Sequence, residues 1–321
     1  MRGVVKPVGR STTDGVITRL DSAEKTDGFF LRRTRRAGIP NESNPAVLTR
    51  KMTETTGRKP EIEEKRMKNR FLGKIEVSPI GMGCMALSHG YGKVPEEKDS
   101  IDAIRAAFDF GCTFFDTAEA YGEKLFYRGH NEQILGKAVE GFRDKVVLAT
   151  KMSFRGVPYQ PGDPVYPILK EHLTKSLENL RTDYVDLYYL HRIHPDMPPE
   201  DAAAAFGKLI DEGLIRGWGL SQVSAAQLDA FHKVTPVSAV QNLYNMLERD
   251  CEEDIFPYCL SHNIGVVPFS PIASGFLSGK ITTDTVFEKV DDVRVFVPQL
   301  SKENIAANQP IVDILNRYAG E

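Results

Sequence analysis

The sequence predicts an α/β fold made of repeated strand–helix units within a chain of 321 residues. Two observations predict it. Short apolar segments recur at intervals long enough for a strand, a helix and two loops, and these segments are apolar throughout, as strands buried on both faces of a parallel sheet are. The intervals between them carry apolar residues at a 3.6-residue period, typical of amphipathic helices. Such units build either an open doubly wound sheet or a closed eight-stranded barrel.

The first 66 residues differ in composition from the rest of the chain. They carry 15 Lys+Arg and 9 Asp+Glu, whereas residues 67–321 carry 26 and 35. Few of their apolar residues follow a helical or strand rhythm, so they cannot bury enough surface to offset the entropy of ordering. Acidic residues inside the segment argue against a transit peptide, and its modest net charge argues against a nucleic-acid-binding arm. We predict a disordered extension over residues 1–66.

The ordered region, residues 67–321, is predicted to open with a hairpin over residues 70–77. Seven strands follow, beginning near Ile80, Thr113, Val146, Val185, Ile215, Val237 and Ile264. The helix after the fifth strand starts with a capping box from Ser224 to Gln227. The segment from Ser278 to Ser301 shows little helical pattern, and residues 302–318 are predicted to be helical. No apolar run approaches the roughly 18 residues that span a membrane.

Polar residues stand where three consecutive apolar strands end. The second strand ends at Asp116, the third at Lys151 and the fourth at His191, and Tyr121 follows Asp116 in the next loop. In a barrel, the active site is built at the carboxyl ends of the strands. One such residue is most simply a strand cap, but three in consecutive units, with a tyrosine one loop away, indicate a catalytic set.

These four residues suit proton delivery to a substrate. Tyrosine has an ordinary pKa near 10, and a nearby lysine ammonium lowers that pKa. A carboxylate on the neighbouring strand would keep the lysine charged, and a histidine can donate a hydrogen bond to a developing alkoxide. We therefore predict Tyr121 as the general acid, Lys151 as the residue that tunes its pKa, Asp116 as the partner of Lys151, and His191 as an orienting residue.

Other motifs carry weaker signals. Residues 81–86 have the letters G-x-G-x-x-A, but a dinucleotide fingerprint requires a helix directly afterwards, and the loop Ser88-His89-Gly90-Tyr91-Gly92 follows instead. We predict a substrate-pocket loop there.

His191 and His194 lack a third metal ligand in register, so no metal site is expected. Four scattered cysteines without a C-x-x-C pair predict buried, reduced thiols, as in the cytoplasm: Cys84, Cys112, Cys251 and Cys259.

Six motifs, in this order, resemble the aldo-keto reductases: FFDTAEAYG, VVLATK, YYLH, GLSQ, AVQNLYN and PFSPIASGFLSGK. The resemblance covers residues 71 to about 318 and is stronger to the bacterial-type branch, which acts on small or sugar-like carbonyls. It implies a (β/α)8 barrel of the TIM type that binds NADP(H), with NAD(H) as an alternative. It also implies direct hydride transfer to an aldehyde or ketone without a metal, with a small carbonyl or alcohol as substrate.

The same resemblance implies roles for individual residues. Asp116, Tyr121, Lys151 and His191 match the family's catalytic tetrad. Ser221, Gln222 and Gln241 match its contacts to the nicotinamide carboxamide, with Gln222 in place of the commoner Asn. Phe269 matches the aromatic residue, often Tyr, that stacks on the nicotinamide. The loop that covers the pyrophosphate is matched by Ser270, Pro271, Gly275, Leu277 and Lys280.

The chain departs from the family's pattern after residues 311–318. The family adds an eighth strand and helix there, including a segment that binds the adenosine 2′-phosphate. We therefore expect a C-terminally incomplete barrel of about seven units, with its first and seventh strands as unpaired edges. Three interpretations stay open: an NAD(P)H-dependent reductase, a non-catalytic regulator that binds a nicotinamide nucleotide, and an incomplete, catalytically impaired reductase.

Overall fold

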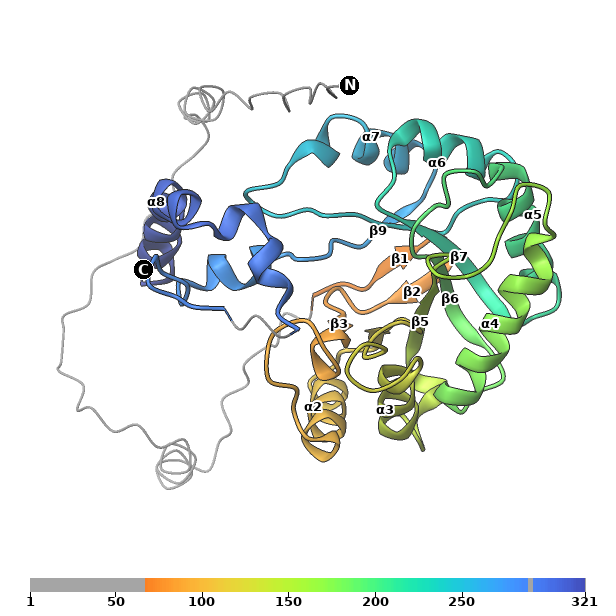
Figure 1. Ribbon diagram of the computed structural model, residues 1–321, viewed down its shortest axis with the longest axis horizontal. Helices are drawn as coiled ribbons and strands as arrows, with labels where there is room; N and C mark the ends of the chain where they lie inside the picture. The colour runs from red at the N-terminus through yellow and green to blue at the C-terminus, as the bar shows by residue number, and fades with distance from the viewer. Residues whose placement is uncertain (1–66, 288–290, 321) are drawn as a thin grey trace, which may run out of the picture. The chain divides into compact units, whose positions relative to one another are not determined.

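The structure, a computed structural model, describes residues 67–287 and 291–320. The predicted disordered extension, residues 1–66, lies outside the described residues. At the centre of the described part is a parallel sheet of seven strands in the order β3-β4-β5-β6-β7-β8-β9 (Figure 1). The strands are β3 (Met82–Gly83), β4 (Phe114–Asp116), β5 (Val147–Met152), β6 (Val185–Leu190), β7 (Ile215–Ser221), β8 (Ala239–Gln241) and β9 (Gly265–Val266).

The strand order decides between the two architectures that the strand–helix units allow. Each strand pairs with the next one along the chain, as in a barrel, whereas a doubly wound sheet reverses its order in the middle. Within the described residues, β3 and β9 are the two edges and do not pair with each other. The sheet is therefore an open half-barrel of seven parallel strands, which confirms the predicted fold class.

Helices follow the strands and cover the outer face of the sheet (Figure 1). They are α2 (Glu97–Asp109), α3 (His130–Ala138), α4 (Val165–Leu180), α5 (Pro199–Asp211), α6 (Ala225–His232) and α7 (Ile255–Ser261). The predicted capping box at the start of α6 is confirmed, because the Ser224 hydroxyl accepts from the Gln227 amide and the Gln227 side chain accepts from Ser224 N–H.

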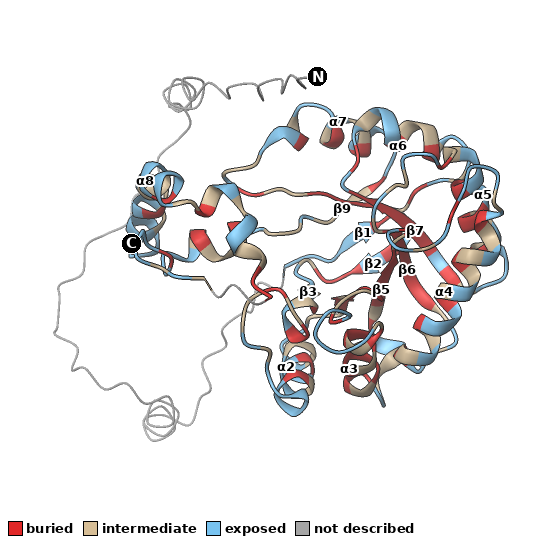
Figure 2. Cartoon of the chain, in the orientation of Figure 1, coloured by how far each residue is buried: buried red, intermediate tan, exposed pale blue. Residues whose placement is uncertain are grey.

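The central strands of the sheet are buried on both faces, which explains why most of their residues are apolar (Figure 2). In β6, Tyr188 and Leu190 belong to the outer core beneath the helices, whereas Leu187 and Tyr189 belong to a separate inner core. The inner core is completed by Leu72, Ile75 and Val77 of the predicted hairpin, which forms as β1 (Arg70–Leu72) and β2 (Ile75–Val77).

The hairpin packs at the amino-terminal end of the strands. A Cβ atom on Gly265, at the start of β9, would lie 2.7 Å from Leu72 Cα and 2.9 Å from the Phe71 carbonyl oxygen, so the hairpin backbone approaches the sheet closely. Because the inner core fills this end, the carboxyl ends of the strands are left to form a site, as in other barrels of this architecture.

The chain after β9 folds into short 3₁₀ turns and one long helix. The turns are Ala273–Ser278, Val293–Phe296 and Pro298–Leu300, and α8 spans Lys302–Ala319, so the predicted terminal helix is confirmed. They share a small core of their own, formed by Ala273, Phe276, Ile281, Leu300, Ile305 and Val312. This core anchors the segment that follows the β9 exit.

All four cysteines are free, and three of them are buried. Cys112 is half-buried, so the expectation that every thiol is buried is wrong at this position. Cys112 ends the turn between α2 and β4, where its thiol lies 3.5 Å from the Ile80 carbonyl oxygen. Among the described helices, none combines the length and the apolar character needed to cross a membrane.

Candidate active site

Lys151 is the centre of the polar cluster at the strand ends. Its side chain is fully buried, and each hydrogen of the ammonium has an acceptor: the Asp116 carboxylate, the Thr117 carbonyl oxygen at 2.6 Å and the Tyr121 hydroxyl at 3.4 Å. Burial lowers the pKa of Lys151, but the charge of Asp116 and the contact with Tyr121 raise it by more, so the net pKa lies above its ordinary value. Lys151 is therefore charged at neutral pH.

Asp116 is held at both carboxylate oxygens. One oxygen accepts from Lys151, and Gln241 Nε2 donates to the other at 2.9 Å. The Asp116 backbone carbonyl accepts from Cys84 N–H at 2.8 Å. Burial, followed by the nearby Asp116 charge, raises the pKa of the Cys84 thiol far above its ordinary value, so Cys84 is a neutral packing residue and not a nucleophile.

Tyr121 presents its hydroxyl to Lys151 from the loop after β4. Burial raises the pKa of Tyr121, the Lys151 charge lowers it, and the net pKa lies above the ordinary value. Lys151 thus acts in the direction that the sequence analysis predicted, but burial outweighs it in this structure. The phenol consequently keeps its proton at neutral pH, as a proton donor must before it reacts.

His191 follows β6 directly and faces Tyr121. The two ring centroids are 5.8 Å apart in an edge-to-face arrangement, and the backbone N–H of His191 donates to the Met152 carbonyl at 2.8 Å. Burial, followed by the positive charges of Lys151 and Arg192, lowers the pKa of His191 to about 3. The imidazole is therefore neutral across the physiological range, with one N–H to donate.

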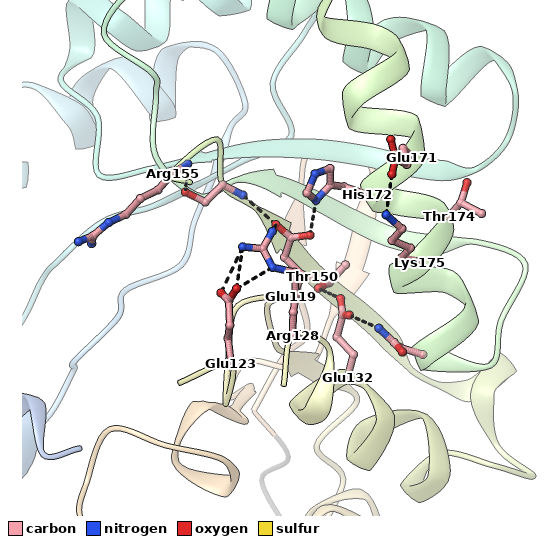
Figure 3. Close-up of polar contacts among 12 residues, drawn as sticks. Glu119, Glu123, Arg128, Glu132, Thr150, Arg155, Glu171, His172, Thr174 and Lys175 are labelled. Atoms are coloured by element: carbon pink, nitrogen blue, oxygen red, sulfur yellow. Dashed lines mark hydrogen bonds and ion pairs between the residues drawn. The ribbon is translucent and has the colours of Figure 1, made fainter. Parts of the chain in front are cut away.

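The loop that carries Tyr121 is anchored by Glu119 (Figure 3). This buried carboxylate lies 2.7 Å from His172 Nδ1 on α4, accepts from Arg128 Nη1 at 3.4 Å, and accepts from Ser153 N–H at 3.4 Å. The Glu119 backbone also joins β5, because its N–H donates to the Lys151 carbonyl at 3.2 Å. Two side chains, those of Arg128 and His172, and one backbone N–H, that of Ser153, thus fix the loop two residues before Tyr121.

Comparison with known proteins assigns the chain to a family. The model of the aldo/keto reductase family matches residues 79–321. The chain belongs to the aldo/keto reductase family. It is 37% identical over 248 residues to the aldo-keto reductase YhdN of Bacillus subtilis, covering 76% of this chain and 73% of that protein.

Solved structures of the family agree with this assignment. The glycerol dehydrogenase of Gluconobacter oxydans superposes with a TM-score of 0.67 at 30% identity, covering 78% of this chain and 77% of that chain. An aldo-keto reductase from Klebsiella pneumoniae, solved in complex with NADPH, superposes with a TM-score of 0.57 at 29% identity over 68% of this chain and 74% of that one.

In this aldo/keto reductase, the residues predicted to contact the carboxamide lie at neighbouring strand exits. Ser221 ends β7 and pairs in register with Gln241 at the end of β8. The Ser221 hydroxyl accepts from Arg192 Nη1 at 3.0 Å, and Gln222 Oε1 accepts from Leu243 N–H at 3.0 Å. The sequence analysis assigned Gln241 only to the nicotinamide carboxamide. In the structure its side-chain amide also donates a hydrogen bond to Asp116, a member of the tetrad.

The predicted pyrophosphate loop follows the β9 exit. Phe269 is half-buried and bridges in parallel to Leu243. Beyond it, Ser270 and Gly275 have φ angles of 52° and 99°, and the Ser270 carbonyl accepts from Asn245 Nδ2 at 3.1 Å. Gly275 suits this left-handed conformation because it has no Cβ atom. Pro271 and Lys280 are exposed and Leu277 is half-buried, so the loop presents an exposed cation.

Two residues near the tetrad were not assigned by the sequence analysis. Arg192 contacts Ser221 and contributes to the low pKa of His191; its only sequence signal is a cation directly after His191. His89 lies with its ring centroid 5.4 Å from that of Tyr121, in the loop predicted to line a substrate pocket. In residues 67–287 and 291–320, no group of three or more His, Cys, Asp or Glu side chains could hold a metal ion.

Proposed function

We propose that this chain is an NADP(H)-dependent reductase that transfers a hydride to an aldehyde or ketone, with Tyr121 as the general acid. The observation that carries the proposal is the hydrogen-bonded series Asp116–Lys151–Tyr121 beside a neutral His191. A buried, paired ammonium that contacts a protonated phenol is an arrangement that packing alone does not require, and family membership gives it a reaction class.

The polar groups at the β7 and β8 exits fit a nicotinamide carboxamide. Since Ser221 Oγ already accepts from Arg192, its own hydrogen is left to donate. Since Gln222 Oε1 accepts from Leu243, its Nε2 is left to donate. Gln241 Nε2 donates to Asp116, which leaves Oε1 to accept. Two donors and one acceptor complement the carbonyl oxygen and the amino group of an amide.

The remaining predicted cofactor residues fit the other parts of the molecule. Phe269, half-buried at the β9 exit, offers an aromatic face for stacking, and the loop from Ser270 to Lys280 offers backbone turns and one exposed cation for a pyrophosphate. The NADPH complex of the Klebsiella pneumoniae relative supports NADP(H) over NAD(H). When bound, the nicotinamide supplies the hydride.

The chain's own residues then handle the proton. The Tyr121 hydroxyl and the neutral His191 N–H bind the substrate carbonyl oxygen and polarise it. As negative charge develops on that oxygen, Tyr121 transfers its proton, which leaves an alcohol and a tyrosinate. The Lys151 ammonium, 3.4 Å from the phenol oxygen, stabilises this tyrosinate, and Asp116 keeps Lys151 charged. Solvent returns a proton to Tyr121 after the alcohol leaves.

The substrate class is a small carbonyl compound or the corresponding alcohol. The relative from Gluconobacter oxydans is named a glycerol dehydrogenase, and oxidation of an alcohol is the same reaction in reverse, with tyrosinate as the base. A short polar substrate suits the cluster, since the imidazoles of His89 and His191 both lie beside the Tyr121 ring.

The proposal is tested by following the near-ultraviolet absorbance of NADPH with the purified chain and a set of short aldehydes and ketones. We expect NADPH loss only when a carbonyl compound is present, with the alcohol formed in equal amount. A second variant, Lys280→Gln, removes the exposed loop cation and should raise the KM for NADPH several-fold with little change in kcat. Tight NADPH binding without carbonyl-dependent loss would instead identify a non-catalytic nucleotide-binding protein.

A further inference from the structure

Asn131, near the start of α3, is a buried amide beside the tetrad, and it is 1% exposed. Its Oδ1 accepts from Thr117 Oγ1 at 2.6 Å. Its Nδ2 donates to the Cys84 carbonyl at 2.9 Å and to Ser88 Oγ at 2.7 Å. Because a carbonyl oxygen can only accept, the Nδ2 end of the amide must face Cys84, which fixes the orientation of the side chain. Asn131 thus ties the loop after β3 to the loop after β4.

The bond to Thr117 leads to Lys151. Thr117 directly follows Asp116 and is fully buried. Its carbonyl oxygen accepts from Lys151 Nζ at 2.6 Å, and its N–H donates to the Ala149 carbonyl at 2.9 Å. The residue is therefore held by β5 at its N–H and by Asn131 at its hydroxyl, and these two anchors set the direction of its carbonyl. Since this carbonyl is an acceptor of the ammonium, Asn131 helps to place Lys151 Nζ.

Asn131 also supports the backbone that carries Tyr121. The Asn131 N–H donates to the Tyr121 carbonyl at 3.4 Å. The next residue, Gly122, packs so closely that a Cβ atom on it would lie 2.9 Å from Ser88 Cβ and 3.2 Å from His130 Nδ1. Ser88 Oγ, which accepts from Asn131, lies 3.0 Å from that same nitrogen of His130. The network around Asn131 therefore forms the surface on which the Tyr121–Gly122 segment rests.

The loop after β3 requires such support because β3 is short and lies at an edge of the sheet. β3 has two residues, and within the described ranges it pairs only with β4. Directly after it, the Cys84 N–H donates to the Asp116 carbonyl at 2.8 Å, while the Cys84 carbonyl accepts from Asn131. Ser88, farther along the loop, is fully buried and bonded to the same amide. Asn131 supplies the support that a second neighbouring strand gives to the inner strands.

We propose that Asn131 is a positioning residue for the proton transfer, acting on Lys151 through Thr117 and on Tyr121 through its backbone. The inference rests on the proposed reductase function and deepens it. A displacement on the order of 1 Å in a catalytic arrangement can cost about a hundredfold in rate. The residues predicted to hold NADPH belong to the β7, β8 and β9 exits, whereas Asn131 joins the loops after β3 and β4. Asn131 should therefore govern the chemical step and not the binding of the cofactor.

The test measures kcat at saturating NADPH, with the short aldehyde that the parent chain reduces fastest, and the Kd for NADPH by fluorescence titration. Asn131→Ala removes all three side-chain bonds and should lower kcat about 30–100-fold, with the Kd within about threefold of the parent. Thr117→Val keeps the shape of the side chain and removes its hydroxyl, so kcat should fall about tenfold, as for the loss of one hydrogen bond. Thr117→Ser keeps the hydroxyl and should retain kcat within about twofold.

A matched control lies two residues farther along α3. Gln133 is half-buried, its Nε2 donates to Asn179 Oδ1 at 3.0 Å, and its Oε1 accepts from the Tyr127 hydroxyl at 2.9 Å. Gln133→Ala therefore removes amide bonds from the same helix that do not lead to the tetrad, and it should leave kcat within about twofold of the parent. Thermal unfolding checks that each variant folds. If Asn131→Ala does not fold, the comparison of Thr117→Val with Thr117→Ser decides the matter.

Two outcomes would overturn the inference while the proposed function stands. The first is a parent chain that reduces the aldehyde and whose kcat is unchanged in Thr117→Val. The second is an equal loss of kcat in Thr117→Val and Thr117→Ser, or a loss of NADPH affinity parallel to that of kcat, because either result marks a general packing role. A parent chain that binds NADPH but reduces no carbonyl compound refutes the proposed function itself, and the inference with it.

Discussion

Replacing Lys151 with methionine removes the ammonium that joins Asp116 to Tyr121, while an unbranched side chain still fills the site. In the folded protein, this ammonium is fully buried and bonded to Asp116, to the Thr117 carbonyl and to Tyr121. Among the described residues, its loss leaves the Gln241 amide as the remaining side-chain partner of the Asp116 carboxylate. The converse variant, Asp116→Asn, leaves a buried ammonium with neutral acceptors only.

Removing one partner of a buried ion pair costs about 3–5 kcal/mol, because the other charge stays behind without compensation. Asp116 is 14% exposed and Lys151 is not exposed. We therefore expect a cost near 3 kcal/mol for Lys151→Met and near 4 kcal/mol for Asp116→Asn. The double variant carries neither charge, so its cost should fall about 2–3 kcal/mol short of the sum of the two single variants.

Urea unfolding of the four proteins measures this coupling, and the single tryptophan of the chain, Trp218, is buried in the core and reports on global unfolding. Free energies that add within about 0.5 kcal/mol would refute the reasoning, because residues that do not interact behave in that way. Such a result would mean that Asp116 and Lys151 do not interact in solution, so that Asp116 is not the group that keeps Lys151 charged beside Tyr121.

Two further predictions concern the surroundings of the tetrad. His191 has a folded-state pKa of about 3, below its unfolded value of about 6.5, so its contribution to stability is complete above pH 6.5 and is lost as the pH falls toward 3. The parent chain should lose about 1–2 kcal/mol more than His191→Gln between pH 7.5 and pH 5 in urea unfolding; equal losses would contradict the pKa. Glu119→Gln should lower stability by about 2 kcal/mol and slow turnover, because Glu119 is 4% exposed and bonded to His172. Its matched control, Glu123→Gln, alters a carboxylate with 46% side-chain exposure and should change stability by less than about 0.5 kcal/mol; similar losses in both variants would contradict the anchoring role of Glu119.

Much of the fold could be predicted because strands buried on both faces of a parallel sheet appear in the sequence as short apolar segments. From Leu187 to Leu190 in β6, residues of the inner core alternate with residues of the outer core, and both faces are buried. The strand is therefore apolar except at Asp186, and it ends where His191 follows. The same rule predicted Asp116, Lys151 and His191 as neighbours, since carboxyl ends of parallel strands meet at one edge.

Contacts between distant segments could not be predicted in this way. Gln241 Nε2 bonds Asp116 across 125 positions, and Gly90 N–H bonds Asp291 across 201 positions. Neither pair has a periodic signal, because each contact depends on how loops cross the end of the sheet and not on local pattern. Asp291 lies in the segment whose weak helical pattern gave no structural prediction, so its hydrogen bond to Gly90 could not be predicted from the sequence.

The net pKa of Tyr121 also depends on tertiary structure. The presence of Lys151 nearby predicted a lowered pKa, but the degree of burial decides the balance, and here burial raises the pKa by more than Lys151 lowers it. Sequence alone gives the identity of the charged neighbour and not the amount of water excluded from the phenol.

The central claim is that Tyr121 delivers the proton, and Tyr121→Phe tests it most directly. The variant keeps the ring that contacts His89 and His191 and removes only the hydroxyl that contacts Lys151. Carbonyl-dependent loss of NADPH should fall by at least about a thousandfold, as expected for the loss of a general acid together with a hydrogen bond to the carbonyl oxygen. NADPH affinity, followed by fluorescence titration, should stay within about threefold of the parent. Retained turnover by a variant that still binds NADPH would contradict the account.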